Sequence, residues 1–288
     1  MSNIVHVIGA GGRSGAALTR ALLAAGTGVQ PVVRDLGRWQ AAALAPDALL
    51  AAPRMADLQD AQAMRAALAD ATRIVSTAHA RHTQDLLAAA PAAARLVLLG
   101  STRRFTRWPD AHGEGVRAGE AALLASGRAG VMLHPTMIYG AAGENNVQRL
   151  AALLRRLPAV PLPGGGRALV QPIHQDDVTR SVLAALAIEQ DGPLALVIAG
   201  PAPLAYAEFV RAVARAAGLK PPRILPIPAA PLMAAAPLIA LLPWLPRVSA
   251  AEIRRLTEDK AFDIGPMSAT LGIRPIPLAA GLALTFRR

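Results

Sequence analysis

The chain contains no cysteine among its 288 residues. This absence excludes a disulfide scaffold, a cysteine-ligated zinc site and a thiol nucleophile, and nothing suggests an oxidising compartment. Aromatic residues are scarce at 3%, and charged residues make up only 17% against 53% apolar residues. That balance excludes a disordered or fibrous chain and leaves a globular protein with much apolar surface to bury.

Clustered positive charge is also missing, although the formal net charge is +11. All but two of the 30 basic residues are arginine, the exceptions being Lys220 and Lys260. The arginines occur singly or in pairs, and few aromatic side chains are present to stack on bases. We therefore expect a small-molecule substrate or an anionic surface as the partner, and no nucleic acid.

Strand and helix patterns alternate through the first half of the chain. Apolar runs predict strands at residues 4–8, 29–33, 48–52, 73–77, 96–100 and 131–134. Helical patterns between them fall at 15–25, 61–69 and 119–125. Strands separated by helices in this rhythm predict an α/β fold with a doubly wound, parallel Rossmann sheet.

The rhythm changes after Gly140, where the pattern predicts a helix at 146–156, a Pro/Gly turn at 162–166, a strand at 169–173 and a helix at 177–188 capped by Asp177. We expect residues 1–140 to form a dinucleotide-binding domain that parts of 167–200 complete. Residues 141–166 and 201–288 are expected to form a smaller C-terminal substrate lobe.

Three glycines follow the first predicted strand and open the first predicted helix. Gly9, Gly12 and Gly15 allow a tight turn, a close approach of backbone N–H groups to a pyrophosphate, and close packing of helix on strand. This context predicts a dinucleotide site rather than a merely structural turn.

The spacing of these glycines, Gly-x-x-Gly-x-x-Gly, resembles the short-chain dehydrogenase/reductase superfamily. The likeness is to its extended and atypical branches, which include sugar-nucleotide epimerases and dehydratases, NmrA-like proteins and complex I accessory subunits. Further segments that fit the resemblance are Val33-Arg34-Asp35, Ala56-Asp57-Leu58, Leu99-Gly100-Ser101-Thr102, His134 to Gly140, and Gly164-Gly165-Gly166 followed by Gln171 to Val178. The resemblance implies that Asp57 lies near the adenine, that the backbone from Pro135 contacts the nicotinamide carboxamide, and that Tyr139 is packed.

Arginines near the end of the second strand favour NADP(H) over NAD(H). Arg34 stands where NAD-selective relatives usually place a carboxylate for the ribose hydroxyls, with Arg13 in the glycine loop and Arg38 one turn further. A guanidinium group binds a 2′-phosphate bidentately. The alternative is that Arg34 is solvated and Asp35 binds the ribose of NAD(H).

Reductases that this chain resembles use a tyrosine acid/base and a lysine one helical turn later. Alignment on Gly119-Glu120-Ala121 places His112 at the tyrosine and Val116 at the lysine, so the dyad is absent. His112 either replaces the tyrosine as a proton donor, since imidazole titrates near neutral pH, or has no catalytic part, and Thr102 is the other candidate. We therefore expect an atypical NADP(H)-binding oxidoreductase or epimerase-like enzyme, or a non-catalytic sensor or structural protein.

No metal site is predicted, because His6, His79 and His82 have no ligand partners at a suitable spacing and His174 is assigned to the start of a helix. The N-terminus lacks an export signal, so we expect a cytoplasmic protein. Residues 224–246 carry no charge, but six prolines would break a spanning helix. We therefore expect short apolar helices that cover the substrate cleft or lie on a membrane surface as a peripheral contact.

Overall fold

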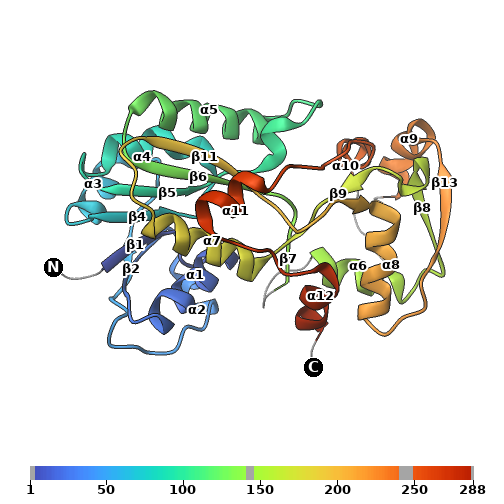
Figure 1. The fold of residues 1–288 in the computed structure, drawn as a ribbon, viewed down its shortest axis with the longest axis horizontal. Coiled ribbons are helices and arrows are strands. Elements are labelled where there is room, and N and C mark those ends of the chain that lie inside the picture. The colour runs from blue at the N-terminus through green and yellow to red at the C-terminus, as the bar shows by residue number, and fades with distance from the viewer. Residues whose placement is uncertain (1–3, 141–145, 240–248, 287–288) are drawn as a thin grey trace.

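The computed structural model describes residues 4–140, 146–239 and 249–286. Its centre is a seven-stranded sheet in the order β11-β6-β5-β4-β1-β2-β3 (Figure 1). The strands are β1 (Ile4–Ile8), β2 (Gly28–Val33), β3 (Arg54–Met55), β4 (Arg73–Ser76), β5 (Arg95–Leu99), β6 (Gly130–Pro135) and β11 (Pro193–Ile198). All neighbouring strands run parallel, and the order reverses at β1. The predicted doubly wound Rossmann sheet is confirmed.

Both faces of the sheet are covered by helices, because its strands are apolar on both sides. In β5, Leu96 and Leu98 pack into one apolar cluster while Val97 and Leu99 pack into the other. Figure 1 shows α3, α4 and α5 above the sheet and α1 and α7 below it. The helices are α1 (Arg13–Ala24), α3 (Ala61–Leu68), α4 (Thr83–Ala89), α5 (Ala111–Ser126) and α7 (Gln175–Ala187).

Five of the six predicted strands agree with the structure to within one residue, and the strand predicted at 48–52 is wrong. Leu50 forms only an isolated bridge with Val29, and the paired strand β3 lies a few residues later. Pro53 stands between the two, and proline has no N–H to donate to a ladder. Continuous pairing therefore starts only at Arg54.

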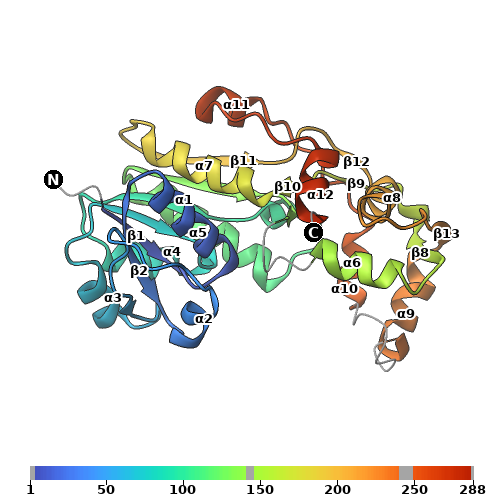
Figure 2. The same cartoon turned by 90° about the horizontal axis from the view of Figure 1, so that it is seen from below.

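The smaller lobe packs around its own apolar cluster, which includes Tyr139 and Phe209. Its elements are β7 (Ile138–Tyr139), α6 (Asn146–Leu154), β8 (Ala159–Pro163), η3 (Gly164–Gly166), β9 (Leu169–Val170), β10 (Ile173–His174), β12 (Leu204–Ala205), α8 (Tyr206–Ala216), β13 (Arg223–Ile227), α9 (Ala229–Ile239), α10 (Ala250–Arg255) and α12 (Leu278–Phe286). Within the range 201–288 that the sequence assigns to the lobe, α11 (Gly265–Leu271) packs instead on the sheet through Met267 and Leu271. Figure 2 shows α11 beside α7 and the lobe at the opposite end from the N-terminus.

Two local predictions in this half need correction. The strand predicted at 169–173 is two short strands, β9 and β10, which pair with different partners. The predicted helix begins at Gln175 rather than Asp177, because His174 is its cap and accepts a hydrogen bond from the Asp176 N–H. Asp177 lies in the first turn, fully buried, where it binds Arg180 and accepts from the Ile276 N–H.

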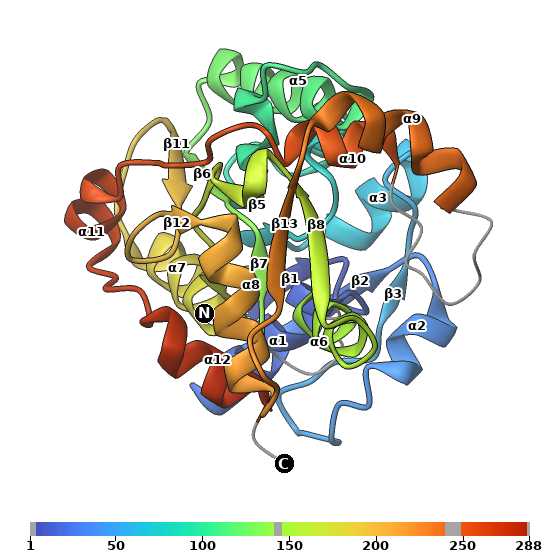
Figure 3. The ribbon, with the colours of Figure 1, turned by 90° about the vertical axis from the view of Figure 1, so that its right-hand side faces the viewer.

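The end of the lobe furthest from the sheet is formed by β13 beside β8 and by α9, as Figure 3 shows. The prediction of short apolar helices at 224–246 is correct for α9 and wrong for β13, which is a strand paired with β8. Residues 240–248 of that prediction lie outside the described residues. Across the described ranges, no helix combines the length and the hydrophobicity needed to cross a bilayer.

Candidate functional site

The glycine loop lies between the end of β1 and the start of α1, at the carboxyl edge of the sheet. Gly9 has a φ of +79°, and a Cβ there would lie 2.8 Å from the Thr77 hydroxyl oxygen. A Cβ on Gly15 would lie 2.2 Å from the Gly9 carbonyl oxygen. Gly12 caps α1, whose first turn contains no acidic residue. The predicted residues thus form a tight loop in front of a helix N-terminus, which fits a pyrophosphate.

Arg13, Arg34 and Asp57 line one cleft of about 630 Å³ together with the glycine loop. Arg34 lies 3.6 Å from the Asp57 carboxylate, yet 72% of its side chain is exposed. Asp35 and Arg38 line the same cleft, and Asp35 caps α2 (Leu36–Ala41) by accepting from the Arg38 N–H. The cleft therefore carries more positive than negative side chains where β2 ends.

A second cleft of about 660 Å³ lies between the sheet and the lobe. Thr136 and Met137 line this cleft, while Ile138 lines the first one. The two clefts therefore lie on either side of one short segment that follows β6. Other residues around the second cleft are Phe105, Phe262, Arg149, Leu150, Tyr206, Phe209, Arg255 and Lys260.

Thr102 and Pro135 lie at the carboxyl ends of β5 and β6. Thr102 lines the second cleft, and its hydroxyl donates to the Pro135 carbonyl oxygen at 3.2 Å. The Ser101 side chain accepts from the Arg103 N–H and caps η2 (Thr102–Phe105). Pro135 itself is buried, so the contact expected with a nicotinamide would fall to the residues that follow it.

His112 lies in the first turn of α5, and Val116 is 1% exposed one turn later. His112 lines neither cleft, but its ring contacts His79 edge-on, with centroids 4.2 Å apart, and His79 lines the first cleft. Burial lowers the pKa of His112, and the Arg103 charge lowers it further. Burial also lowers the pKa of His79 to about 4, with the neighbouring His112 charge adding to the effect.

The contact between the two histidines is a feature that sequence reasoning missed. His79 follows β4 and His112 begins α5, and the carboxyl edge of the sheet brings them together. The Nδ1 atom of His79 accepts from the Arg81 N–H, so in the neutral ring Nε2 carries the proton.

A buried polar cluster of His134, Glu120 and Arg104 lies next to Ser101, at the start of η2. His134 Nε2 lies 2.9 Å from Glu120 Oε2, not aligned as a hydrogen bond, and Arg104 lies 2.7 Å from the other carboxylate oxygen. His134 Nδ1 accepts from the Ser101 N–H. Burial lowers the pKa of His134 to about 4, aided by the Arg104 charge, and burial raises the pKa of Glu120. The cluster holds the start of the turn that carries Thr102.

The loop between β5 and α5 is tied to the lobe by two carboxylates. Asp110 caps α5 at the Gly113 N–H, binds Arg103, and lies 3.3 Å from Arg255 of α10. Glu258, which is 6% exposed, accepts from the Thr106 hydroxyl at 2.9 Å and from a neighbouring backbone N–H. The lobe therefore helps to position the helix that carries His112.

Tyr139, which the resemblance assigns to packing, is fully buried in the lobe cluster. Burial raises the pKa of its phenol, and the Asp177 charge raises it further. In the described part of the chain, no three histidine, aspartate or glutamate side chains gather as metal ligands would.

No protein-family model and no curated protein sequence matches the chain. Solved structures do match it in fold. The NADPH-dependent quinone oxidoreductase QOR2 from Escherichia coli, in complex with NADPH, superimposes with a TM-score of 0.75 at 16% identity, covering 98% of this chain and 100% of that one. UDP-glucuronic acid 4-epimerase from Bacillus cereus, in complex with UDP-glucuronic acid and NAD, has a TM-score of 0.74 at 16% identity, with 98% of each chain covered. MoeE5 in complex with UDP-glucose and NAD gives 0.73 at 20% identity, covering 98% of this chain and 97% of that one.

By their names, these neighbours include a sugar-nucleotide epimerase and a quinone oxidoreductase. The chain has their fold over almost its whole length, so the resemblance seen in the sequence is confirmed at the level of the fold. The MoeE5 structure contains NAD, and the QOR2 structure contains NADPH.

Proposed function

We propose that the protein is an NADP(H)-dependent oxidoreductase that works without the Tyr-x-x-x-Lys dyad. The observation that carries the proposal is the pair of clefts on either side of residues 136–138. A hydride transfer needs donor and acceptor carbons in contact, and adjacent clefts allow this. Bound NADP(H) would supply or accept the hydride.

The choice of NADP(H) over NAD(H) rests on the arginines of the first cleft. Arg34 is held near Asp57 while 72% of its side chain is exposed, so its guanidinium group could bind a 2′-phosphate. Arg13 and Arg38 line the same cleft. Asp35, the alternative ribose ligand, already caps α2 through one of its carboxylate oxygens.

Two side chains of the protein are candidates for a part in the hydride-transfer reaction, the hydroxyl of Thr102 and the imidazole of His112. The Thr102 hydroxyl donates a hydrogen bond to the Pro135 carbonyl oxygen, which leaves its own oxygen free to accept one from a substrate in the second cleft. His112 is the candidate proton donor, in contact with His79 at the wall of the first cleft. Because burial lowers the pKa of His112, this ring is protonated to a smaller extent at neutral pH than a free imidazole.

A non-catalytic NADP(H)-binding sensor is the second candidate. It is favoured by Val116, a fully buried aliphatic side chain in place of the expected lysine, so one anchor for the nicotinamide ribose is missing. Such a protein would bind the dinucleotide but transfer no hydride.

Cofactor choice is tested by titrating the protein with NADPH and with NADH in a calorimeter. We expect tighter binding of NADPH, and a loss of about tenfold or more in that affinity for Arg34→Ala, since a charge-assisted hydrogen bond contributes about 1.5–3 kcal/mol. The NADH affinity should change little. Arg65→Ala, an exposed arginine of α3 outside the cleft, is the matched control. Equal affinities for the two cofactors would overturn the assignment.

Activity is tested by single-turnover oxidation of bound NADPH against carbonyls, quinones and activated alkenes, repeated with His112→Phe. General acid catalysis contributes about 10²–10⁴ in rate, so the variant should lose that much while its NADPH affinity holds. Tight NADPH binding without oxidation of any acceptor would instead favour the sensor. Oxidation that His112→Phe leaves unchanged would remove the histidine from the mechanism.

A further inference from the structure

An unusual apolar surface lies at the end of the lobe furthest from the sheet. From Ile224 to Ala235 every residue is isoleucine, leucine, methionine, alanine or proline, and none of them is buried. Leu225 on β13 is 46% exposed. The sequence of α9 contains no polar residue, so this helix has no hydrophilic side to turn toward water. Contiguous exposed apolar surface of this kind marks an interaction site.

This segment does not cover the substrate cleft. None of the residues from 223 to 235 lines either of the two clefts described above. Ile224, Pro226, Ile227 and Pro228 line a separate groove of about 520 Å³ instead. Of the two expectations for the apolar stretch, the described residues therefore favour a surface role.

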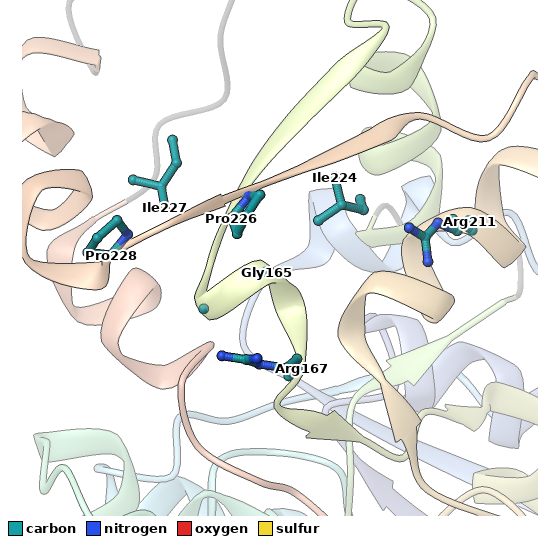
Figure 4. Close-up of a pocket in the computed structure, with 8 residues that line it drawn as sticks. Gly165, Arg167, Arg211, Ile224, Pro226, Ile227 and Pro228 are labelled. Carbon is teal, nitrogen blue, oxygen red and sulfur yellow. The ribbon is translucent and has the colours of Figure 1, made fainter.

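Basic side chains border the groove. Figure 4 shows Arg167, which follows η3, and Arg211 of α8 on the same side of β13, with Arg211 near Ile224 and Arg167 further below the strand. Arg167 is exposed, and Arg211 is paired with Glu208 at 2.5 Å. Arg223 is exposed at the start of β13. Among the residues that the structure describes, no acidic side chain lines the groove.

We propose that this β13–α9 face, formed by residues 223–235 with Arg167 and Arg211, binds the surface of an anionic bilayer. Its apolar side chains would enter the boundary between headgroups and acyl chains, while the arginines bind lipid phosphates. The charge favours a bilayer over a second copy of this chain, because two copies meeting through the face would bring like-charged arginines together.

The placement of the face suits a peripheral contact. Figure 3 looks directly onto β13 and β8, with α9 beside them, and Figure 1 places these elements at the end of the lobe away from the sheet. Binding at this end leaves the first cleft open to solvent. The inference is therefore independent of whether the protein oxidises NADPH.

The test is flotation of the full chain with vesicles of phosphatidylcholine alone and of phosphatidylcholine mixed with phosphatidylglycerol, at low and at high salt. We expect binding to the anionic vesicles that high salt weakens. Leu225→Glu should lower the partition coefficient at least tenfold. Leu49→Glu, at a leucine of similar exposure (42%) before β3, is the matched control and should change it less than twofold.

Arg223→Gln should reduce binding about fivefold, since one basic residue near the surface contributes about 1 kcal/mol, and Arg65→Gln should not. NADPH affinity and thermal melting confirm that each variant is folded. Absence of binding to anionic vesicles, or equal effects of Leu225→Glu and Leu49→Glu, would overturn the proposal. So would a concentration-dependent dimer that Leu225→Glu dissociates, because the face would then be a contact between two copies.

Discussion

Replacing Gly15 by alanine tests the glycine loop most directly. The added Cβ would lie 2.2 Å from the Gly9 carbonyl oxygen and 2.8 Å from the Ala10 Cα atom, whereas ordinary contacts are 3.4–4 Å. Both neighbours are backbone atoms, so the loop must move by about 1 Å, at a cost of about 3 kcal/mol. Alanine is favoured over glycine inside a helix by about 1 kcal/mol. The net loss in the free energy of unfolding should be about 2 kcal/mol, or about 4–8 °C in Tm.

Thermal melting followed by circular dichroism measures this loss, and calorimetry measures NADPH affinity, which should fall at least about tenfold because the displaced loop holds the pyrophosphate. Gly12→Ala, whose Cβ would lie 3.1 Å from the same carbonyl, should show a smaller loss. Gly192→Ala has nothing within 4 Å and should change stability by less than about 0.5 kcal/mol. A Gly15→Ala variant as stable as Gly192→Ala, with unchanged NADPH affinity, would refute the reasoning.

Three further predictions concern charge. The ring of His134 should titrate by NMR near pH 4, and because the unfolded imidazole titrates near 6.5, its contribution to stability is complete above pH 6.5 and is lost as the pH falls toward 4. Asp70→Asn should lower the free energy of unfolding by about 1 kcal/mol at pH 7, because it removes a partly exposed ion pair with Arg54 that has two hydrogen bonds (2.6 and 2.9 Å). The Arg54 hydrogen bond holds the Asp70 pKa below its usual 3.8. The difference from wild type in urea unfolding should therefore vanish in strong acid. If His112 donates the proton, the single-turnover rate should rise as the pH falls below 6.5, and Arg103→Gln should move that limb to higher pH, since the Arg103 charge lowers the His112 pKa.

The central fold could be predicted from the sequence because its signals are local. Each strand of the sheet except β3 and β11 is a compact apolar run between a helix and a turn residue, and the glycines after β1 fix the loop. The missed strand β11 begins at Pro193, after the polar residues 189–191, where proline masks the pattern. The wrong strand prediction at 48–52 also involves a proline, since Pro53 separates these apolar residues from the paired strand β3.

The site could be predicted only where its residues directly follow strands of the sheet. Gly9, Gly12, Arg13, Arg34 and Asp57 line one cleft because all of them follow strands at the same edge of a parallel sheet. The contact of His79 with His112, and the place of Glu120 beside His134, depend on how α5 packs across the strands. No spacing within the sequence encodes that packing.

The ties from Asp110 to Arg255 and from Thr106 to Glu258 have a consequence for how the chain folds. They join residues about 150 positions apart, and α11, which covers part of the sheet, also comes late in the sequence. A nascent chain cannot complete the surroundings of α5 until its last third has been synthesised. A fragment ending before residue 249 should therefore expose the apolar surface that α11 covers, and its loop 102–110 should be open to proteases. Sheet and lobe should accordingly melt together in one cooperative transition, rather than as two separable domains.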